Sequence, residues 1–195
     1  MTILALDGLM RVGKTSTIQY LKKELTGIRV IEEVLPIKLI EAENQFLNEG
    51  DDNFYICNDW AKSRLIGQHV EEKWVVMDRY FLSTIAYMFS RDKEFPNIEC
   101  IKEKTQQLFG GINLPDIWIL IVCDPVASWK RSCEQIGLEN LGLWGDLSFV
   151  KRLSLNFERI FELFSSLYPF VKLFIIKSDE LVANPNMLKK FLREE

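Results

Sequence analysis

The fold of this chain is decided by residues 2–17, which read TILALDGLMRVGKTST. A short apolar run leads into Gly8-x-x-x-x-Gly13-Lys14-Thr15, and this spacing matches the phosphate-binding loop pattern G-x-x-x-x-G-K-[ST]. In such a loop the glycines let successive backbone N–H groups point at one anion, and the following helix adds its positive end. We expect the Lys14 ammonium to reach the β- and γ-phosphates of a nucleotide and the Thr15 hydroxyl to ligate Mg²⁺. The segment expected to bind the donor nucleotide comprises Gly8, Leu9, Met10, Arg11, Val12, Gly13, Lys14, Thr15 and Ser16.

The alternative is a glycine-containing turn before an ordinary helix. The context favours the phosphate loop, because an apolar strand-like run precedes it. The stretch from Thr15 to Leu25 then carries apolar residues at helical spacing and stops before Gly27.

Length and composition indicate one globular domain over residues 1–195. Apolar residues make up 48% and charged residues 27%, which is ordinary for a folded protein of this length. The net charge is −4 and no basic block appears, so binding to duplex nucleic acid is disfavoured. No run reaches 18 apolar residues and no secretory leader is visible, so we expect a cytoplasmic protein with no membrane partner.

The cysteines and the single histidine give no sign of a structural metal. Cys57, Cys100, Cys123 and Cys133 are far apart and form no C-x-x-C pair, so we interpret them as reduced thiols. His69 alone cannot build a histidine-based metal centre.

Strand and helix patterns alternate along the rest of the chain. Besides the run before Gly8, strands are expected at 28–31, 73–78, 116–123 and 171–176, and the strand at 73–78 is apolar without alternation, as buried parallel strands are. Helices are expected at 15–25, 37–48, 54–72, 83–90, 96–110, 125–135 and 147–167, and from Asn184-Pro185 onward, with residues 51–53 as N-caps of the third. This order predicts a doubly wound α/β domain: a five-stranded parallel sheet with helices on both faces and ligands at the carboxyl ends of the strands. Gly137–Asp146 contains three glycines and no Lys or Arg, so we interpret it as a mobile lid loop.

A second informative stretch, DRYFLSTIAY at residues 78–87, follows the third strand. Asp78 and Arg79 leave the same edge of the sheet at which the phosphate loop opens. A carboxylate there can hold a Mg²⁺-bound water, and a guanidinium can clamp a second phosphate in bidentate fashion. A solvated salt bridge at a strand end is the alternative.

The pattern D-R-Y-x-x-S-x-x-A-Y resembles the acceptor-site motif of thymidylate kinases. The loop from Gly8 to Thr15 resembles their phosphate loop of the subtype with arginine in the middle. In that subtype the loop arginine replaces arginines that other members carry in the lid. Arg11 together with a lid that lacks cations matches this exchange. The resemblance runs from residue 2 to about residue 177, is carried by the two motifs, and implies a P-loop NTPase fold of the nucleotide kinase type.

The resemblance also implies an acceptor pocket. Family members carry an aromatic residue four positions before an arginine on the helix ahead of the D-R strand, and Trp60 and Arg64 have this spacing and would share one helix face. A core tryptophan beside a surface arginine is the alternative. Glu32 and Glu33 follow the second strand, where related kinases place an acidic residue near the acceptor, and either could instead be a surface charge. The residues expected to bind the acceptor are Glu33, Trp60, Arg64, Arg79, Tyr80, Ser83 and Tyr87.

Three features depart from the family pattern. Met10 stands where the arginine-loop subtype has an acidic residue that holds the sugar 3′-hydroxyl, and Met88 stands where many members have Gln. The stretch between Arg64 and Asp78 is shorter than the family leads us to expect. These departures concern the identity of the acceptor and leave phosphoryl transfer in place.

We therefore expect an ATP- and Mg²⁺-dependent nucleoside monophosphate kinase similar to thymidylate kinase, which converts dTMP and ATP to dTDP and ADP. The resemblance implies that Lys14, Arg11, Asp78 and Arg79 are catalytic and that Thr15 and Asp78 hold the metal. Two alternatives stay open: a deoxynucleoside kinase, with Glu32 or Glu33 as general base, and a nucleotide-binding protein without transfer activity. Family members commonly pair through helices, so a homodimer is possible, although the sequence leaves the oligomeric state open.

Overall fold

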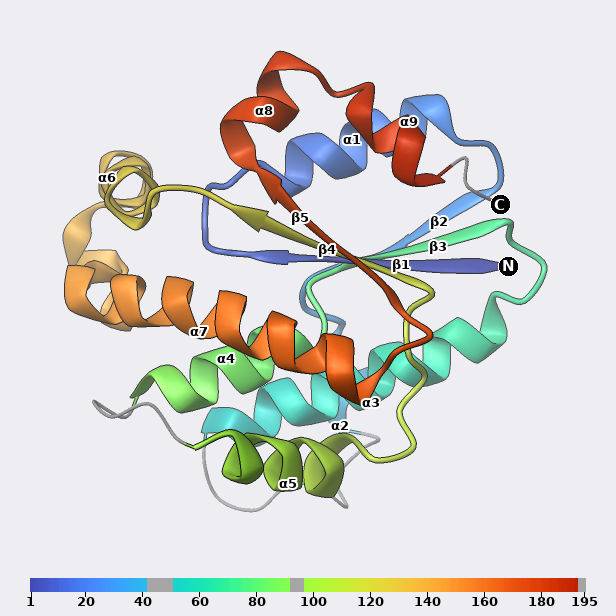
Figure 1. Ribbon diagram of the computed structural model, residues 1–195, viewed down its shortest axis with the longest axis horizontal. Helices are drawn as coiled ribbons and strands as arrows, with labels where there is room; N and C mark the ends of the chain where they lie inside the picture. Colours follow the sequence, from blue (N-terminus) through green and yellow to red (C-terminus); the bar gives the residue numbers. More distant parts are fainter. Residues whose placement is uncertain (42–50, 92–96, 193–195) are drawn as a thin grey trace.

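The computed structural model describes residues 1–41, 51–91 and 97–192, and their core is a five-stranded sheet (Figure 1). The strand order is β2-β3-β1-β4-β5, and every neighbouring pair is parallel. Parallel strands between two helix layers are buried on both faces, which is why the central strands are almost continuously apolar. The strands are β1 (Thr2–Gly8), β2 (Ile28–Ile31), β3 (Trp74–Asp78), β4 (Ile117–Val122) and β5 (Lys172–Lys177).

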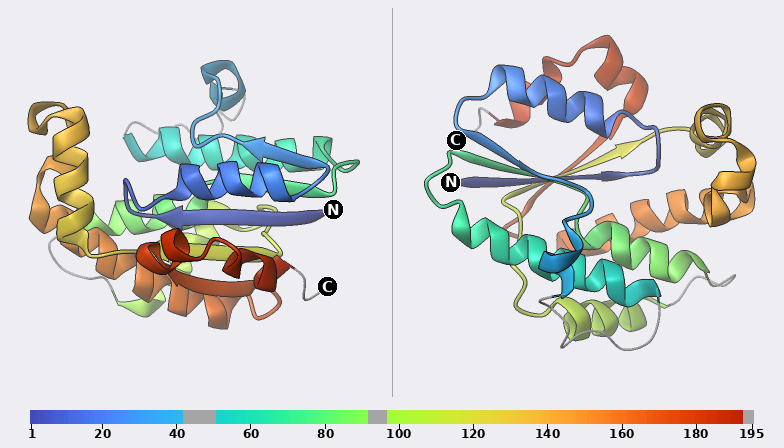
Figure 2. Two further views of the ribbon diagram at one scale, coloured as in Figure 1. Left: turned by 90° about the horizontal axis from the view of Figure 1, so that it is seen from above. Right: turned by 180° about the vertical axis from the view of Figure 1, so that it is seen from behind.

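Helices cover both faces of the sheet, which confirms the predicted architecture. In Figures 1 and 2, α1, α8 and α9 lie on one face, whereas α3, α4 and α7 lie on the other, with α5 outside them. The start of β1 and the last described helix, α9, lie on the same side of the molecule in both figures. The helices are α1 (Lys14–Glu24), α2 (Ile37–Glu41), α3 (Asp51–Gln68), α4 (Phe81–Arg91), α5 (Ile98–Phe109), α6 (Pro125–Ile136), α7 (Leu147–Leu167), α8 (Ser178–Ala183) and α9 (Met187–Leu192).

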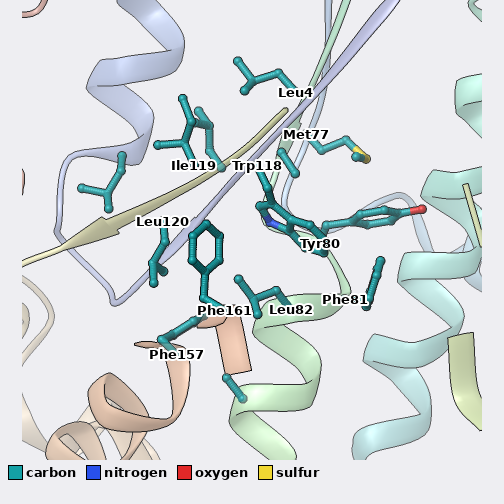
Figure 3. Packing of buried hydrophobic residues seen from close by; sticks show 14 of the residues in the cluster. Leu4, Met77, Tyr80, Phe81, Leu82, Trp118, Ile119, Leu120, Phe157 and Phe161 are labelled. Atoms are coloured by element: carbon teal, nitrogen blue, oxygen red, sulfur yellow. The ribbon is translucent and has the colours of Figure 1, made fainter. Parts of the chain in front are cut away.

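An aromatic cluster fixes α4 and α7 against the sheet (Figure 3). The ring of Phe81, at the start of α4, lies 4.9 Å from the Trp118 ring and 5.0 Å from the Phe109 ring. Phe164 of α7 packs against Trp118 at 5.4 Å. Because Phe81 lies only two residues after Arg79, this packing also fixes where the Asp78-Arg79 pair leaves the sheet.

Most predicted boundaries are confirmed to within two residues, and aspartate side chains cap the start of two helices. Asp124 accepts a hydrogen bond from the Val126 N–H, and Asp146 accepts one from the Ser148 N–H. The helix expected from Pro96 begins at Ile98, because Asn97 caps it through the Cys100 N–H.

Two predictions about α3 were wrong, and one helix was missed. Residues 51–53 lie inside the first turn of α3 and do not precede it. Turns at 66–72 end α3 at Gln68, four residues early, because the chain must reverse to enter β3. Helix α8 follows β5 directly, where we predicted no helix, and Asp179 and Glu180 in its first turn favour its positive end. The helix expected at 37–48 is described only up to Glu41, and its remainder lies outside the described residues.

The segment 137–146 forms two short 3₁₀ helices, η2 (Leu138–Asn140) and η3 (Gly142–Gly145). Gly137 and Gly142 have φ angles of 84° and 53°, which glycine adopts without strain. The Trp129 indole of α6 donates to the Gly145 carbonyl oxygen at 2.9 Å, so this segment packs against α6. That it opens and closes as a lid stays a prediction.

Candidate active site

A cavity of about 780 Å³ opens at the carboxyl ends of the strands, where a doubly wound sheet binds its ligands. The phosphate loop, the ends of β2 and β3, and α3, α4, α6, η3, α7 and α8 all contribute to its wall. The sequence-predicted residues on the wall are Met10, Arg11, Gly13, Lys14, Thr15, Ser16, Glu33, Asp78, Arg79, Tyr80, Ser83 and Tyr87. Those absent from the wall are Gly8, Leu9, Val12, Trp60 and Arg64.

The phosphate loop has the backbone geometry that its glycines predict. Gly8 has a φ angle of 141°, and a Cβ atom there would lie 2.3 Å from the Ile121 carbonyl oxygen, so only glycine fits beside β4. Gly13 occupies the N-cap of α1 with a φ angle of 101°, and Arg11 also has a positive φ, 56°. The Ser128 hydroxyl of α6 donates to the Met10 carbonyl oxygen at 2.6 Å and supports the loop from outside.

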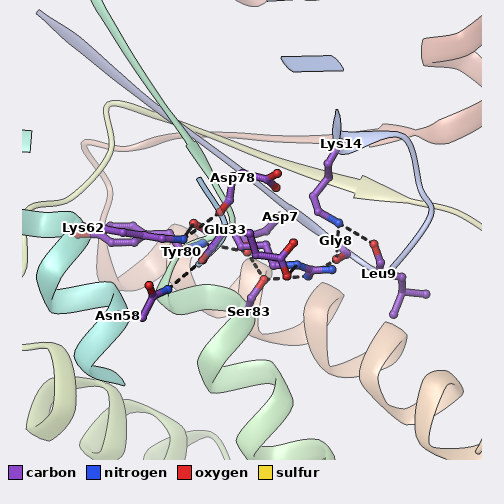
Figure 4. Close-up of polar contacts among 11 residues, drawn as sticks. Asp7, Gly8, Leu9, Lys14, Glu33, Asn58, Lys62, Asp78, Tyr80 and Ser83 are labelled. Atoms are coloured by element: carbon purple, nitrogen blue, oxygen red, sulfur yellow. Dashed lines mark hydrogen bonds and ion pairs between the residues drawn. The ribbon is translucent and has the colours of Figure 1, made fainter. Parts of the chain in front are cut away.

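Two cations converge on one carbonyl oxygen of the loop (Figure 4). The Lys14 ammonium donates to the carbonyl oxygens of Leu9 at 2.8 Å and Gly8 at 3.3 Å. The Arg79 guanidinium donates to the same Gly8 oxygen at 2.6 Å. Burial and the neighbouring Arg79 charge lower the pKa of Lys14 to about 7. A bound polyanion would favour the charged lysine, so the site is built to receive negative charge at this point.

Asp7, the last residue before the loop glycine, is a buried carboxyl that sequence analysis missed as a site residue. Its oxygens accept hydrogen bonds from the Ser83 hydroxyl, the Trp118 indole at 2.6 Å and the Tyr80 N–H at 3.3 Å. Burial raises the pKa of Asp7 despite these bonds and the nearby Arg79 charge. Asp7 thereby ties the start of α4 to β1 and holds Ser83 next to Arg79, to which Ser83 is also hydrogen bonded.

Lys62 of α3 is a second residue that the sequence did not reveal. Its side chain is fully buried, and its ammonium donates at 2.9 Å to the carbonyl oxygens of Asp78 and of Arg79 (Figure 4). Arg79 has a φ angle of 58°, a conformation that non-glycine residues adopt rarely. The Lys62 bonds fix the peptide groups on both sides of this bend, and with them the direction of the Arg79 side chain.

Glu33, and not Glu32, lies at the site. Its carboxylate lines the cavity and forms an ion pair with the Arg79 guanidinium at 2.8 Å, whereas Glu32 is absent from the cavity wall. Burial raises the pKa of Glu33, but the charges of Arg79, Lys14 and Lys62 outweigh it and hold that pKa below its ordinary value.

Asp78 has an oxygen suited to a cation. Its Oδ1 atom is buried and has no hydrogen-bond partner among the described residues. Burial and the neighbouring Glu33 charge raise the pKa of this carboxyl, and the Lys14 charge opposes them. An orphaned carboxylate oxygen beside the phosphate loop is the kind of ligand that Mg²⁺ prefers, so the residues present are compatible with this metal.

The predicted placement of Trp60 and Arg64 was wrong. Trp60 faces away from the cavity, because its indole donates to the Leu108 carbonyl oxygen of α5 at 2.9 Å. Arg64 is exposed, one turn further along α3. The side chains of α3 that line the cavity are Tyr55, Asn58, Asp59 and Lys62. The one signal in the sequence was the short stretch between Arg64 and Asp78, a departure from the family pattern on this helix.

The outer part of the cavity is aromatic, and Tyr87 lies there as predicted. Its ring lies 6.1 Å from the Tyr55 ring and stacks on Trp144 of η3 at 6.5 Å. Trp144 also lies against the Arg79 guanidinium, whose Cζ atom is 5.9 Å from the ring centroid. Tyr80, in contrast, is fully buried and donates its hydroxyl hydrogen to the Asn113 carbonyl oxygen, so its hydroxyl is committed to the protein interior.

This geometry can be compared with known proteins. A family model described as thymidylate kinase matches residues 31–166, which is more than half of the chain. The chain belongs to the thymidylate kinase family. It is an ATP-dependent phosphotransferase. No protein in the curated set matches the chain.

Solved structures of two kinds of kinase share the fold of this thymidylate kinase family member. A Candida albicans thymidylate kinase is 20% identical, with 98% of this chain and 92% of that chain covered and a TM-score of 0.67. An M. mycoides deoxyadenosine kinase with the products dCMP and a flexible dCDP is 16% identical, with full coverage of both chains and a TM-score of 0.67. The same kinase with bound dATP is 15% identical, with 99% and 100% covered and a TM-score of 0.69. At these identities the likeness concerns the fold alone.

Proposed function

We propose that this protein transfers the γ-phosphoryl group of ATP to the phosphate of a nucleoside monophosphate. The observation that carries the proposal is the convergence of Lys14 and Arg79 on the Gly8 carbonyl oxygen. Two phosphate groups that must react with one another repel strongly, and cations between them remove that repulsion. Lys14 lies on the donor side, in the phosphate loop. Arg79 lies on the side of α3 and α4, where an acceptor can enter.

On the donor side, the backbone of residues 8–15 surrounds the ATP phosphates. Ser16, in the first turn of α1, completes this phosphate-binding segment. Lys14 and Arg11 neutralise charge on the transferred group, and Arg131 of α6 adds a third cation on the cavity wall. Ser178 and Val182 of α8 line the same end of the cavity and provide a surface for the adenine base. Arg131 and α8 extend the predicted donor site beyond the loop.

Mg²⁺ is held in this proposal by the Thr15 hydroxyl and by Asp78, which lines the cavity and whose Oδ1 atom has no hydrogen-bond partner among the described residues. When bound, the ion neutralises phosphate charge, as it does in other phosphoryl-transfer enzymes. The protein's own part is to hold Asp78 at the end of β3, which Lys62 does through the Asp78 carbonyl oxygen.

On the acceptor side, Arg79 binds the monophosphate, and Ser83 and Asp7 hold Arg79 and α4 in register. Tyr87 and Tyr55 form aromatic walls. Closure of η2 and η3 over the reacting phosphates would exclude water, which otherwise hydrolyses ATP. The oligomeric state, including a homodimer, stays a prediction.

A deoxynucleoside kinase is the second candidate, because the Glu33 carboxylate lies at the cavity beside Arg79. In that reaction Glu33 would accept the proton of a sugar hydroxyl that attacks the γ-phosphorus. The arrangement favours the first candidate, since Glu33 is already ion-paired and its low pKa makes it a weak base.

One assay separates the two candidates. The protein is incubated with ATP and Mg²⁺ and either the four deoxynucleoside monophosphates or the four matching deoxynucleosides, and ADP formation is followed. We expect ADP formation with at least one monophosphate and none above background with the nucleosides. Phosphorylation of nucleosides with monophosphates ignored would replace the proposed function by the second candidate.

A further inference from the structure

Asp59 is a buried carboxyl on the cavity wall that the phosphoryl-transfer scheme does not use. It lies on α3, is 2% exposed, and its Oδ2 atom accepts a hydrogen bond from the Thr84 hydroxyl of α4 at 2.6 Å. A carboxylate has about four acceptor positions, and the Thr84 hydroxyl takes one of them. An acidic group with spare acceptor capacity in a ligand cavity calls for a ligand that brings hydrogen-bond donors.

Helix α4 gives the position of Asp59 along the cavity. Ser83 is hydrogen bonded to Arg79 at the phosphate end, and Tyr87, one turn further on, contacts Tyr55 in the aromatic part. Thr84, which holds Asp59, lies between these two positions. A monophosphate bound at Arg79 therefore extends its sugar and base toward Asp59 and the two tyrosine rings.

The charge of Asp59 decides which part of the acceptor it can contact. A carboxylate repels phosphate oxygens and the lone pairs of a keto oxygen, whereas it accepts hydrogen bonds from an N–H₂ group. The neighbouring Asn58 does not compete, because its amide is committed to the Leu35 N–H and the Glu33 carbonyl oxygen, both at 2.9 Å. On the same helix face, the Lys62 ammonium donates to two backbone carbonyl oxygens.

We propose that Asp59 is a specificity-determining residue that selects acceptor nucleotides whose base carries an exocyclic amino group, cytosine or adenine, over bases with a keto oxygen at the same ring position. This inference rests on the proposed monophosphate kinase function and narrows its acceptor. It moves the preferred acceptor away from thymidylate. The aromatic walls of Tyr55 and Tyr87 hold the ring of either base, and Asp59 contacts its amino edge.

Matched substrate pairs test this directly when they are assayed at about pH 8, because burial raises the pKa of Asp59 to about 7 and its carboxyl is ionised above that value. The pair dCMP and dUMP differs in an amino or keto group at one position of the pyrimidine and in the proton that the adjacent ring nitrogen carries in the keto base, and dAMP and dIMP differ in the same way on the purine. We expect kcat/KM of the wild-type protein to favour the amino member of at least one pair by about tenfold or more, because the keto member leaves the buried carboxylate unpaired. A keto preference in both pairs would overturn the inference.

Asp59→Asn gives the second test. The Thr84 hydroxyl can keep donating to the amide oxygen, which leaves the amide N–H₂ group, a donor, toward the ligand. The amino-to-keto ratio is therefore expected to fall by about tenfold or to reverse. Asp116→Asn, an exposed aspartate at the opposite end of the sheet whose carboxylate accepts from the Ile3 N–H, is the matched control and should leave the ratio unchanged.

The other possible results of these assays also support or overturn the proposed role of Asp59. An active Asp59→Asn variant with the wild-type ratio, including one in which only discrimination between ribose and deoxyribose changes, would overturn the inference. If the variant does not fold, the two wild-type ratios decide alone. If only nucleosides are phosphorylated, the proposed function fails. Deoxycytidine against deoxyuridine and deoxyadenosine against deoxyinosine then test Asp59 in the same way.

Discussion

Lys14 and Arg79 donate hydrogen bonds to the same atom, the carbonyl oxygen of Gly8, although 65 residues separate them in the chain. The sheet produces this meeting, because β1 and β3 are parallel neighbours and both end at the cavity. One cation thus lies on the donor side and the other on the acceptor side of a single point. The account of phosphoryl transfer depends on this relationship.

Replacing Lys14 by alanine should lower kcat by about 10²–10³, because a preorganised positive group at the transferred phosphate is lost. The fold should survive, since the buried ammonium contacts only loop carbonyl oxygens. Steady-state kinetics measure the rate, and circular dichroism checks the fold. Lys23→Ala, an exposed lysine on the same helix, is the control. Turnover within a few-fold of wild type would remove Lys14 from the mechanism.

Replacing Arg79 by alanine should raise KM for the monophosphate acceptor by at least tenfold and change KM for ATP much less. The guanidinium is the cation on the acceptor side, and a bidentate contact to a phosphate is lost with it. Initial rates at varied acceptor and varied ATP concentration separate the two constants. Equal increases in both constants would place Arg79 on the donor nucleotide.

Replacing Lys62 by methionine should lower both the stability of the fold and the affinity for the acceptor, because Lys62 fixes the backbone at Arg79. Two buried carbonyl oxygens lose their donor, so the free energy of unfolding is expected to fall by about 1–3 kcal/mol. Because the Arg79 bend is then less well fixed, KM for the acceptor should rise more than KM for ATP. Lys151→Met, an exposed lysine on α7, is the control. A loss of stability without any change in the ratio of the two KM values would leave Lys62 with a structural role only.

Trp144 should report closure of the segment 137–146 over the acceptor. Its ring lies against the Arg79 guanidinium and stacks on Tyr87, so a phosphate and base arriving there must change its surroundings. We expect acceptor binding to change tryptophan fluorescence in the wild type and Trp144→Phe to abolish most of that change. The other four tryptophans of the chain remain in the variant as an internal reference. An undiminished signal in Trp144→Phe would place the change elsewhere.

Asp59 should make stability depend on pH. Burial, reinforced by the Asp7 charge, raises the pKa of Asp59 to about 7, although the Lys62 charge and the Thr84 hydrogen bond oppose it. Between about pH 4 and pH 7 the folded protein therefore holds a proton that the unfolded chain, with a pKa near 3.8, releases, and above this range the carboxyl of the folded protein is ionised as well. This contribution to the free energy of unfolding falls as pH rises from about 4 to about 7.

The Asp59→Asn variant isolates that contribution, because the amide does not titrate. Relative to wild type, it should gain stability by the order of a few kcal/mol between pH 4 and pH 8. Urea unfolding at four pH values across this range measures the difference. A difference that is constant with pH would mean that Asp59 has the same affinity for protons in the folded and unfolded chain.

The sequence predicted the sheet and both phosphate-directed motifs because each depends on local order. The loop glycines, Lys14 and the Asp78-Arg79 pair follow strands whose apolar runs are unambiguous, and parallel strands bring their carboxyl ends together. The phosphate end of the site therefore followed from the chain alone.

The acceptor end of the site could not be predicted from the sequence, because it depends on how α3 is rotated about its own axis. The spacing of Trp60 and Arg64 places them on one helix face but does not say which face meets the cavity. Polar residues on the buried side of α3, such as Asp59 and Lys62, blur the apolar stripe that usually reveals it. Likewise, Glu32 and Glu33 are equivalent in the sequence, and only the course of the chain after β2 decides that Glu33 reaches Arg79.

The central claim is that the acceptor is a phosphate, and the fate of the γ-phosphoryl group tests it most directly. The protein is incubated with ATP labelled in the γ-phosphoryl group, Mg²⁺ and a mixture of deoxynucleoside monophosphates and deoxynucleosides, and the labelled products are separated. The account predicts label in the β-position of a deoxynucleoside diphosphate, lost in Lys14→Ala. Label found in deoxynucleoside monophosphates, or only in inorganic phosphate, would contradict it.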